Sequence, residues 1–457
     1  MRPAYLVWDL KKLFPKLVVT EEEALLMTQR ELTPGEGLEF VIRGVRDRYL
    51  GVDESWKELY TWYRQNEGQK VDRILDAGFF KKKPDALTGE EAAELYGEKK
   101  QFSVTRMERF SACAYAHFLT YGLHLSDRER YEFEAMDLGN IAHQSMERFA
   151  RKAQEKRMSW PKLEEVQRDA MIEESVEESI KDYGNTVLYS TARNEYMIVR
   201  IKQLIRRSVW ALTRQMEKGD FEPSGYEMNF GSGKIDRVDT CEDEDVVYVK
   251  VTDYKTGMKS FDIVALYHGL QMQLPVYLNA ALELEERRAS GKTVEPAGIF
   301  YYRIKDPIVD REKDDHALEE KILKELRLDG MINAKEEVIE HLEHQLSGTS
   351  VLNPIGKNKD GSLNRYSKVL PPEAFAAMLS YTKKKEAQVK RQIYAGEVQA
   401  NPYELNGSTG CDYCAYRDIC GFDPRLDGYA YRSLEKYSKE EVIRRMEEEI
   451  ENREEPS

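Results

Sequence analysis

The sequence predicts an α/β fold in which helical segments precede and follow a small group of strands. Apolar residues recur at helical spacing as far as about Glu217, and from Tyr226 onward they alternate with a period of two. A long helical stretch then separates two strand patterns, which is typical of α/β proteins. With 457 residues the chain is too long for one ordinary core, so we expect two or three domains.

Composition excludes several classes of protein. Hydrophobic residues make up 41% and charged residues 33%, which rules out collagen-like, mucin-like and wholly disordered chains. No apolar run is long enough to span a membrane, and the first residues lack the features of a secretory signal, so we expect a cytoplasmic protein. The net charge of −14 is unlike that of a protein that coats DNA, so any nucleic-acid contact must be a local groove.

The first half of the chain is predicted to be helical. Residues 1–98 form a helical region without a metal or catalytic cluster, and a polar stretch with Pro and Gly marks its end. A helix is predicted over about 102–122, with Met107, Phe110 and Cys113 on one face, and a second over about 137–156. Helices continue to about Glu217.

The second half begins with a predicted hairpin. Apolar residues alternate over 226–230, and Gly231 and Gly233 interrupt the pattern. Residues 234–240 then lead into a turn over 241–245, and a strand over 246–255 follows. The later elements are predicted as a helix over 260–286, a strand over 297–304, charged helices over 315–346, a helix over 371–394 and, within residues 431–457, an acidic tail that is a solvated helix or a frayed end.

The hairpin carries the strongest catalytic signal. Side chains at i and i+2 of a strand share a face, so Asp253 and Lys255 point the same way as Val251 before them. In an antiparallel hairpin Asp236 lies opposite residues 249–253. We therefore expect two carboxylates and a lysine to meet at one place.

This set of residues suits phosphodiester hydrolysis. Mg²⁺ binds through one or two carboxylates, polarises a phosphoryl oxygen and activates a water molecule. A lysine beside the ion can orient that water or neutralise charge in the transition state. The ordinary alternative is an exposed hairpin with one Asp–Lys pair on its surface.

Two helical pairs could complete the site. Gly139 and His143 lie at i, i+4 on one helix face, as do Gln273 and Tyr277. A lone helical histidine is more often structural, and a Gln–Tyr pair at this spacing is more often core packing. Both gain functional meaning only from the neighbouring hairpin.

The cysteines form a separate pattern. Cys411, Cys414 and Cys420 lie close together in a loop rich in Gly and Asp, and Cys113 can supply a fourth thiolate. Four thiolates suit zinc or an iron–sulfur cluster, and the spacing of three plus one remote cysteine favours the cluster. Cys241, in the predicted hairpin turn, is interpreted as a free thiol.

Three basic stretches are candidate walls of a DNA groove. They are Arg200–Arg207, Lys357–Lys368 and Lys383–Arg391, with Tyr254 or Tyr277 placed near a base. Each is equally well explained as a solvated helix face or loop.

Taken in order over about residues 100–425, these motifs resemble the C-terminal nuclease region of the AddB family, a RecB-like branch of the PD-(D/E)XK nucleases. The resemblance implies a mixed central sheet flanked by helices, over residues 99–430, closed by a four-cysteine cluster. It also implies roles for the site residues. His143, Asp236 and Asp253 would bind Mg²⁺ (or Mn²⁺), Lys255 would be the catalytic lysine, Gln273 and Tyr277 would support the site and the DNA strand, and Cys113, Cys411, Cys414 and Cys420 would hold a [4Fe-4S] cluster.

The implied function is Mg²⁺-dependent exonucleolytic cleavage of a DNA strand in double-strand break repair and recombination. The implied partners are a single DNA strand and, where a helicase-like region is present, an AddA-type helicase subunit in a heterodimer. Only about 100 residues precede the nuclease part, so residues 1–98 would be a remnant of that region or a linker from it. The alternatives are a catalytically silent DNA-binding module and a nuclease with zinc at the cysteines.

Overall fold

The computed structural model describes most of the chain. The described residues are 5–18, 32–47, 55–79, 86–97, 102–126, 135–183, 187–189, 191–231, 233–289, 291–312, 314–426 and 428–451. They divide into two compact units, Met1–Lys83 with Asp423–Tyr429, and Pro84–Phe422 with Ala430–Ser457. None of the described helices combines the length and the apolar character needed to cross a membrane.

The first unit is helical in its described part. Its helices are α1 (Tyr5–Leu13), α2 (Pro34–Asp47), α3 (Trp56–Asn66) and α4 (Gly68–Gly78). A small core of Val41, Tyr63 and Val71 holds α2, α3 and α4 together. The second unit begins before residue 99, because the Leu87 backbone N–H donates to the Gly396 carbonyl at 2.9 Å.

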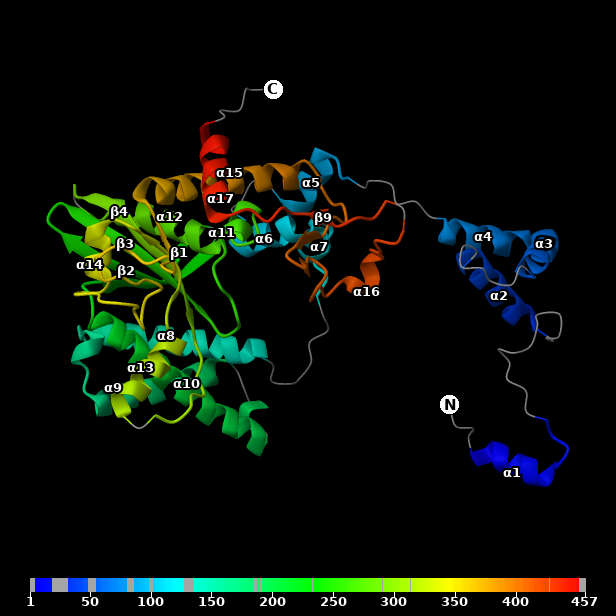
Figure 1. The fold of residues 1–457 in the computed structure, drawn as a ribbon, viewed down its shortest axis with the longest axis horizontal. Coiled ribbons are helices and arrows are strands. Elements are labelled where there is room, and N and C mark those ends of the chain that lie inside the picture. The colour runs from blue at the N-terminus through cyan, green and yellow to red at the C-terminus, as the bar shows by residue number, and fades with distance from the viewer. Residues whose placement is uncertain are drawn as a thin grey trace. The chain divides into compact units, whose positions relative to one another are not determined.

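A six-stranded mixed sheet lies at the centre of the second unit (Figure 1). Its order is β1-β2-β3-β4-β5-β6, and only the β3–β4 and β5–β6 pairs are parallel. The strands are β1 (Glu222–Phe230), β2 (Gly233–Asp243), β3 (Val246–Lys255), β4 (Thr293–Arg303), β5 (Asp329–Asn333) and β6 (Val369–Leu370). The predicted α/β class with a mixed sheet is confirmed.

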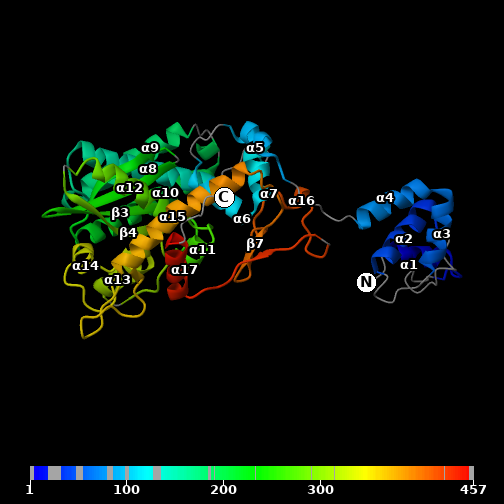
Figure 2. The same cartoon turned by 90° about the horizontal axis from the view of Figure 1, so that it is seen from above.

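Helices cover both faces of the sheet (Figures 1 and 2). One face packs on α8 (Ala135–Glu155), α9 (Glu165–Asp182), α10 (Ala192–Met216), α13 (Asp315–Glu325) and α14 (Glu336–Leu342). The other packs on α6 (Val104–Ala112), α11 (Ile263–Tyr267), α12 (Gln273–Glu286), α15 (Pro372–Tyr394) and α17 (Lys439–Glu451). Alternate residues of β3 enter the two cores, with Val249 in the second and Tyr248 in the first, as the period of two predicts.

Some predicted elements differ in the structure. The helix expected over 102–122 breaks at Cys113, whose extended backbone separates α6 from α7 (Ala114–His117). The helix expected over 260–286 breaks into α11 and α12 around Gly269, which has a φ of 79°. The charged stretch 315–346 contains β5, because a short buried strand follows α13.

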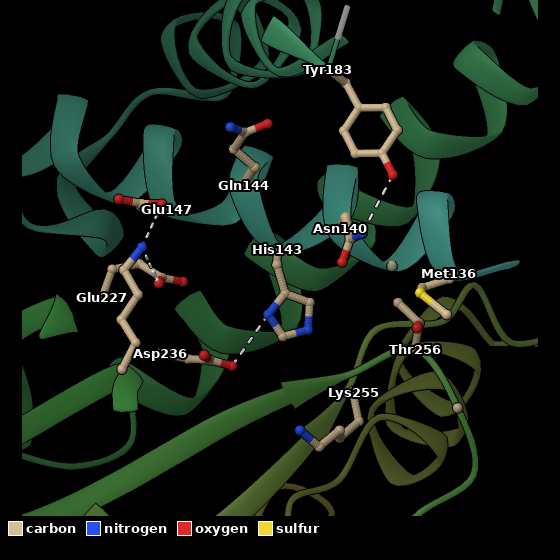
Figure 3. A pocket seen from close by; sticks show the side chains of 13 residues that line it. Met136, Asn140, His143, Gln144, Glu147, Tyr183, Glu227, Asp236, Lys255 and Thr256 are labelled. Atoms are coloured by element: carbon tan, nitrogen blue, oxygen red, sulfur yellow. Dashed lines mark hydrogen bonds and ion pairs between the residues drawn. The ribbon is translucent and has the colours of Figure 1, made fainter. Parts of the chain in front are cut away.

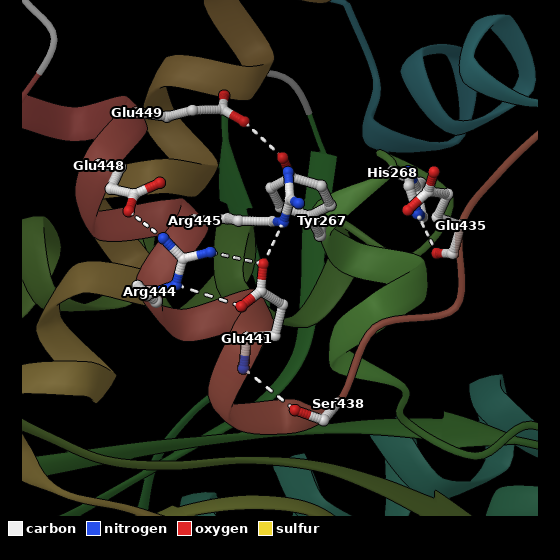
Figure 4. Close-up of polar contacts among 9 residues, drawn as sticks. All are labelled: Tyr267, His268, Glu435, Ser438, Glu441, Arg444, Arg445, Glu448 and Glu449. Atoms are coloured by element: carbon white, nitrogen blue, oxygen red, sulfur yellow. Dashed lines mark hydrogen bonds and ion pairs between the residues drawn. The ribbon is translucent and has the colours of Figure 1, made fainter.

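The C-terminal helix α17 is docked, so its prediction as a solvated tail was wrong. Val442 and Met446 are fully buried in the core shared with α15. Polar contacts fix the same helix (Figure 4). Tyr267 donates to Glu449 at 2.7 Å, and Arg445 pairs with Glu441 at 2.7 Å.

We expect Met446→Ala to destabilise the second unit by about 2–4 kcal/mol, because it removes a fully buried side chain and leaves a cavity. Chemical denaturation measures the change. Glu440→Ala, at an exposed position of the same helix, is the matched control and should shift stability by less than about 0.5 kcal/mol. Equal effects of the two substitutions would contradict the docking of α17.

Candidate active site

The β2–β3 hairpin brings the two predicted aspartates together. Arg237 pairs with Thr252 in the antiparallel register, so Asp236 lies opposite Asp253, as predicted. The backbone N–H of Tyr254 donates to Asp236 Oδ2 at 2.8 Å, which fixes that carboxylate beside β3. The turn itself is only Glu244 and Asp245, because β2 continues as far as Asp243.

Lys255 and Asp253 form an ion pair at the end of β3. Asp253 is 2% exposed, whereas a quarter of the Lys255 side chain reaches solvent. Burial raises the pKa of Asp253 to about 7, the charge of Asp236 adds to this, and Lys255 opposes it. A carboxyl group in this state exchanges its proton readily for a cation near neutral pH.

Helix α8 places His143 over the hairpin. His143 Nδ1 lies 3.3 Å from Asp236 Oδ2. Burial lowers the pKa of His143, but the hydrogen bond and charge of Asp236 outweigh burial and raise it overall. A Cβ added at Gly139 would lie 3.1 Å from Thr256 Oγ1, so a small residue there lets α8 approach the end of β3.

These charges give a testable pH dependence in the metal-free protein. The raised pKa of Asp253 means that the unfolded chain ionises first, so stability falls as pH rises from about 4 to about 7. His143 acts in the same direction, since its stabilising proton is lost as pH rises through its raised pKa. Melting temperatures in chelator should therefore fall between pH 5 and pH 8, and Asp253→Asn should flatten the curve. Parallel curves for the two proteins would contradict the buried, protonated Asp253.

A pocket of about 630 Å³ opens beside these residues (Figure 3). It is lined by residues of α8, β1 and β2 and by the end of β3, and His143, Asp236 and Lys255 point into it. The hollow therefore gives access from solvent to the converged groups.

Glu227 is a site residue that the sequence analysis missed. His143, Glu227 and Asp236 each offer a ligand atom, and these atoms lie within 4.8 Å of one another. Burial raises the pKa of Glu227, while its partner Lys234, at 2.7 Å, lowers it. The only signal in the sequence was an acidic residue within an alternating strand. In the structure Glu227 has a φ of 46°, which is irregular for a strand residue.

Gln273 and Tyr277 lie on the first turns of α12, next to the same carboxylates. Gln273 Nε2 donates to the Tyr277 hydroxyl at 3.0 Å. Burial raises the pKa of Tyr277, and the negative charges of Asp253 and Asp236 raise it further. Glu108, which the sequence analysis also missed, accepts from the backbone N–H groups of Met272 and Gln273 at 2.7 and 3.0 Å and caps α12.

The structure also gathers the four predicted cysteines. Cys113 lies at the break between α6 and α7, and the loop 410–421 carries the other three. Burial raises the pKa of Cys411, and the charges of Cys113, Cys420 and Cys414 raise it further, so all four thiols are neighbours. A Cβ at Gly410 would lie 2.8 Å from the Ala112 carbonyl, so only glycine lets this loop approach Cys113 so closely.

Local hydrogen bonds hold the cysteine loop in place. The N–H of Ala114 donates to Asn401 Oδ1 at 2.9 Å, and the hydroxyl of Tyr416 donates to the Leu125 carbonyl at 2.7 Å. The N–H of Phe422 lies 3.4 Å from Cys420 Sγ. The described cysteines form no disulfide. Cys241 was predicted to lie in the hairpin turn, and this was wrong. It lies in β2, where it is 4% exposed.

Two of the three basic stretches contain side chains that form ion pairs within the fold. On α10, Lys202, Arg206 and Arg207 pair with acidic groups of α9 and with Asp306. On α15, Lys383 pairs with Glu283 and Lys390 with Glu386. These ion pairs favour the alternative of a helix surface with ordinary charge pairs, and the role of the two helices as DNA-groove walls stays a prediction.

Comparison with known proteins identifies the family. Residues 101–421 match the model of the PD-(D/E)XK nuclease superfamily. The chain belongs to this superfamily. The matched range includes the hairpin, α8, α12 and all four clustered cysteines, so the nuclease fold expected from the sequence is confirmed.

Curated proteins similar to this chain include subunits of a helicase/deoxyribonuclease. The chain is similar to proteins named as the B-type subunit of an ATP-dependent helicase/deoxyribonuclease, with 36% identity to that of Lachnoclostridium phytofermentans over 97% of this chain. Identity is 31% to that of Alkaliphilus oremlandii over 99% of this chain, and 32% to that of Caldanaerobacter subterraneus over 97%. The nuclease chain spans 40–42% of the length of these relatives. The resemblance to the AddB family is confirmed.

Proposed function

We propose that the chain is a Mg²⁺-dependent deoxyribonuclease that hydrolyses phosphodiester bonds of a single DNA strand. The observation that carries the proposal is that Asp236 lies opposite the buried Asp253, and that His143, Asp236 and Lys255 line an open pocket. This is the arrangement that metal-assisted phosphodiester hydrolysis requires.

The donor set fits a hard divalent cation. His143, Asp236 and Asp253 would hold Mg²⁺ or Mn²⁺. Glu227 offers a further carboxylate, since its ligand atom lies within 4.8 Å of those of His143 and Asp236. Apart from its ion pair with Lys255, the buried Oδ2 of Asp253 accepts no hydrogen bond from the described residues. The charge of Lys255 compensates this oxygen, and a bound cation would add to that compensation. When bound, the ion polarises the phosphoryl group and makes water nucleophilic.

The chain's own groups supply the remaining chemistry. Lys255 would neutralise the negative charge that grows on the phosphoryl oxygens, because its ammonium group reaches the pocket from the end of β3. Tyr254 positions Asp236 through its backbone N–H, and Gln273 fixes the Tyr277 hydroxyl near both aspartates. These contacts keep the site in place before the substrate binds.

A basic pocket next to the site offers a path for the DNA backbone. It has a volume of about 320 Å³ and contains five cationic side chains, those of Lys255, Lys259, Arg303, Lys305 and Arg327. Two carboxylates, Glu325 and Asp329, also line it, and Glu325 pairs with Lys305 at 2.7 Å, so the cations outnumber the acidic groups. Arg303 lines this pocket, and its guanidinium group would bind a phosphate of the strand. Lys255 lines both pockets, and a strand that passes from one to the other would carry a phosphate past it.

The four cysteines fit a [4Fe-4S] cluster better than zinc. Tetrahedral zinc would bring their sulfurs within about 4 Å of one another. Among the described residues, no three of these cysteines have sulfurs that all lie within 4.8 Å of one another. Each sulfur of a four-iron cluster binds a different iron, which suits wider spacing. The cluster would be structural, since it joins α6 to the C-terminal loop.

The relatives' name suggests the setting of the reaction. A protein that belongs to an ATP-dependent helicase and deoxyribonuclease needs a motor partner, so an AddA-type helicase subunit is the proposed partner in double-strand break repair and recombination. In that assembly the motor would feed a single strand to the exonuclease site. Residues 1–98 would then derive from, or connect to, the helicase-like part.

Cleavage of an end-labelled single-stranded oligonucleotide tests the proposal. The full chain, purified anaerobically, should degrade the strand in Mg²⁺ and should not degrade it in chelator. Cleavage that is equal in both conditions would refute metal dependence. Binding without cleavage in Mg²⁺ would instead identify a catalytically silent DNA-binding module.

Lys255→Ala should lower the turnover rate roughly 10²-fold or more with little change in affinity for DNA, because the lysine acts on charge that develops in the transition state. Lys255→Arg should restore little, since a planar guanidinium does not replace a compact ammonium. Single-turnover kinetics and a binding isotherm separate the two quantities. Lys324→Ala, on α13, is the control. A wild-type rate for Lys255→Ala would remove the lysine from the mechanism.

A further inference from the structure

We propose that the chain has a second metal site, outside the nuclease pocket, at which Asp220, Cys241 and His341 bind a zinc ion with His344 as a fourth ligand. The three first-named residues each offer a ligand atom, and these atoms lie within 4.8 Å of one another. The residues come from the turn before β1, from β2 and from α14, so the sequence gives no local motif for the site.

The geometry converges on one carboxylate oxygen. Asp220 Oδ2 lies 2.8 Å from His341 Nδ1 and 2.7 Å from His344 Nε2. Two imidazole nitrogens therefore point at the same place, while Cys241 approaches from the neighbouring strand β2 and is 4% exposed. A carboxylate, imidazoles and a thiol thus lie around one point, whereas a surface ion pair needs only one acidic and one basic group.

The donor chemistry favours zinc over the hard cations. A thiolate, two imidazoles and a carboxylate match a tetrahedral, borderline-soft ion, whereas Mg²⁺ and Ca²⁺ prefer oxygen alone. His341 also has a partner for its other ring nitrogen, since Nε2 lies 3.4 Å from Asp243 Oδ2. Histidines that bind a metal through one nitrogen commonly donate a hydrogen bond from the other to a carboxylate.

The backbone holds the ligands in position. Asp220 N–H donates to the His341 carbonyl at 2.9 Å, and His344 N–H donates to the Lys218 carbonyl at 2.8 Å. A Cβ added at Gly219 would lie 2.4 Å from the His341 carbonyl oxygen, so glycine is needed for this close approach. Backbone hydrogen bonds thus join the turn after α10 to the end of α14 beside the proposed zinc ligands.

The site is separate from the nuclease chemistry. Cys241 lies five residues along β2 from Asp236, a distance of about 17 Å in an extended strand. A zinc ion there would tie the far end of the β2–β3 hairpin to α14 and stabilise the sheet. The inference does not depend on the proposed nuclease activity, since neither its ligands nor its test involves DNA.

Zinc content and zinc-dependent melting of the full chain test the site. The wild type, Cys241→Ser and His341→Gln are equilibrated with buffered zinc, dialysed, and analysed for metal per chain. All three retain the same cluster cysteines, so the difference between them isolates this site. His316→Gln is the matched control, because His316 is exposed and lies 3.9 Å from a single glutamate.

We expect the wild type and His316→Gln to hold about one zinc ion per chain more than either site variant. Zinc should raise the melting temperature of the wild type and of His316→Gln, but not that of Cys241→Ser or His341→Gln. Circular dichroism verifies that the variants are folded, and His341→Gln provides a partly exposed position if Cys241→Ser unfolds the strand. Equal zinc content in wild type and folded variants would overturn the proposal and leave an ordinary His–Asp hydrogen-bond cluster.

Discussion

Asp253→Ala is expected to reduce DNA cleavage roughly 10³-fold or more, because metal-assisted catalysis supplies several kcal/mol of transition-state stabilisation. Asp253 is the buried carboxylate on which the proposed cation site depends, and its Oδ2 has Lys255 as its ion-pair partner. Affinity for DNA should change little, since the cationic side chains of the neighbouring pocket remain. Cleavage kinetics and fluorescence anisotropy measure the two effects.

Two further variants make this result specific. Asp253→Asn keeps the shape of the side chain and removes only its charge, so it should be as inactive as alanine and well folded. Asp310→Ala removes an exposed carboxylate and should cleave at the wild-type rate. Wild-type cleavage by Asp253→Ala would show that the metal is held elsewhere.

Cys414→Ala is expected to abolish the visible absorption of the cluster, to lower the melting temperature of the protein by roughly 10 °C and to weaken DNA binding. Three thiolates do not retain a stable four-iron cluster, and its loss releases a clamp between segments about 300 residues apart in sequence. Closing a loop of that length costs on the order of 5 kcal/mol of chain entropy, which the cluster would offset. Visible absorption and thermal melting under anaerobic conditions provide the measurements.

Tyr413→Asn is the matched control for the cysteine loop. Tyr413 is fully exposed beside Cys414, and its φ of 63° is one that asparagine tolerates. This variant should keep its colour and its melting temperature. A colourless Cys414→Ala protein with unchanged stability would refute the clamp, and a colourless wild type with bound zinc would refute the cluster.

The hairpin could be predicted from sequence because its signals are local. The period of two and the acidic turn placed Asp236 opposite residues 249–253, and the shorter turn in the structure sets the register that puts it opposite Asp253. His143 was recognised through its spacing from Gly139, and the structure explains that glycine by the close approach of Thr256. These residues needed no knowledge of distant contacts.

Other features depend on contacts between distant segments, which a periodicity cannot reveal. Strand β5 is short and follows a charged helix, so its burial against β4 leaves little trace in the sequence. Helix α17 has an acidic surface, and only two fully buried residues, Val442 and Met446, reveal its docking. Glu227 joins the site through the fold of β1 beside α8, and Cys241 was misplaced because β2 extends into the expected turn.

A Mn²⁺ binding titration tests the central claim most directly. Electron paramagnetic resonance measures the binding, because the signal of free Mn²⁺ decreases as the ion binds to the protein. The claim is that His143, Asp236 and Asp253 hold a divalent cation beside Lys255. The wild type should bind Mn²⁺ saturably, Asp236→Asn and Asp253→Asn should lose that binding, and Asp310→Asn should keep it. Unchanged Mn²⁺ affinity in Asp236→Asn and Asp253→Asn would contradict the account.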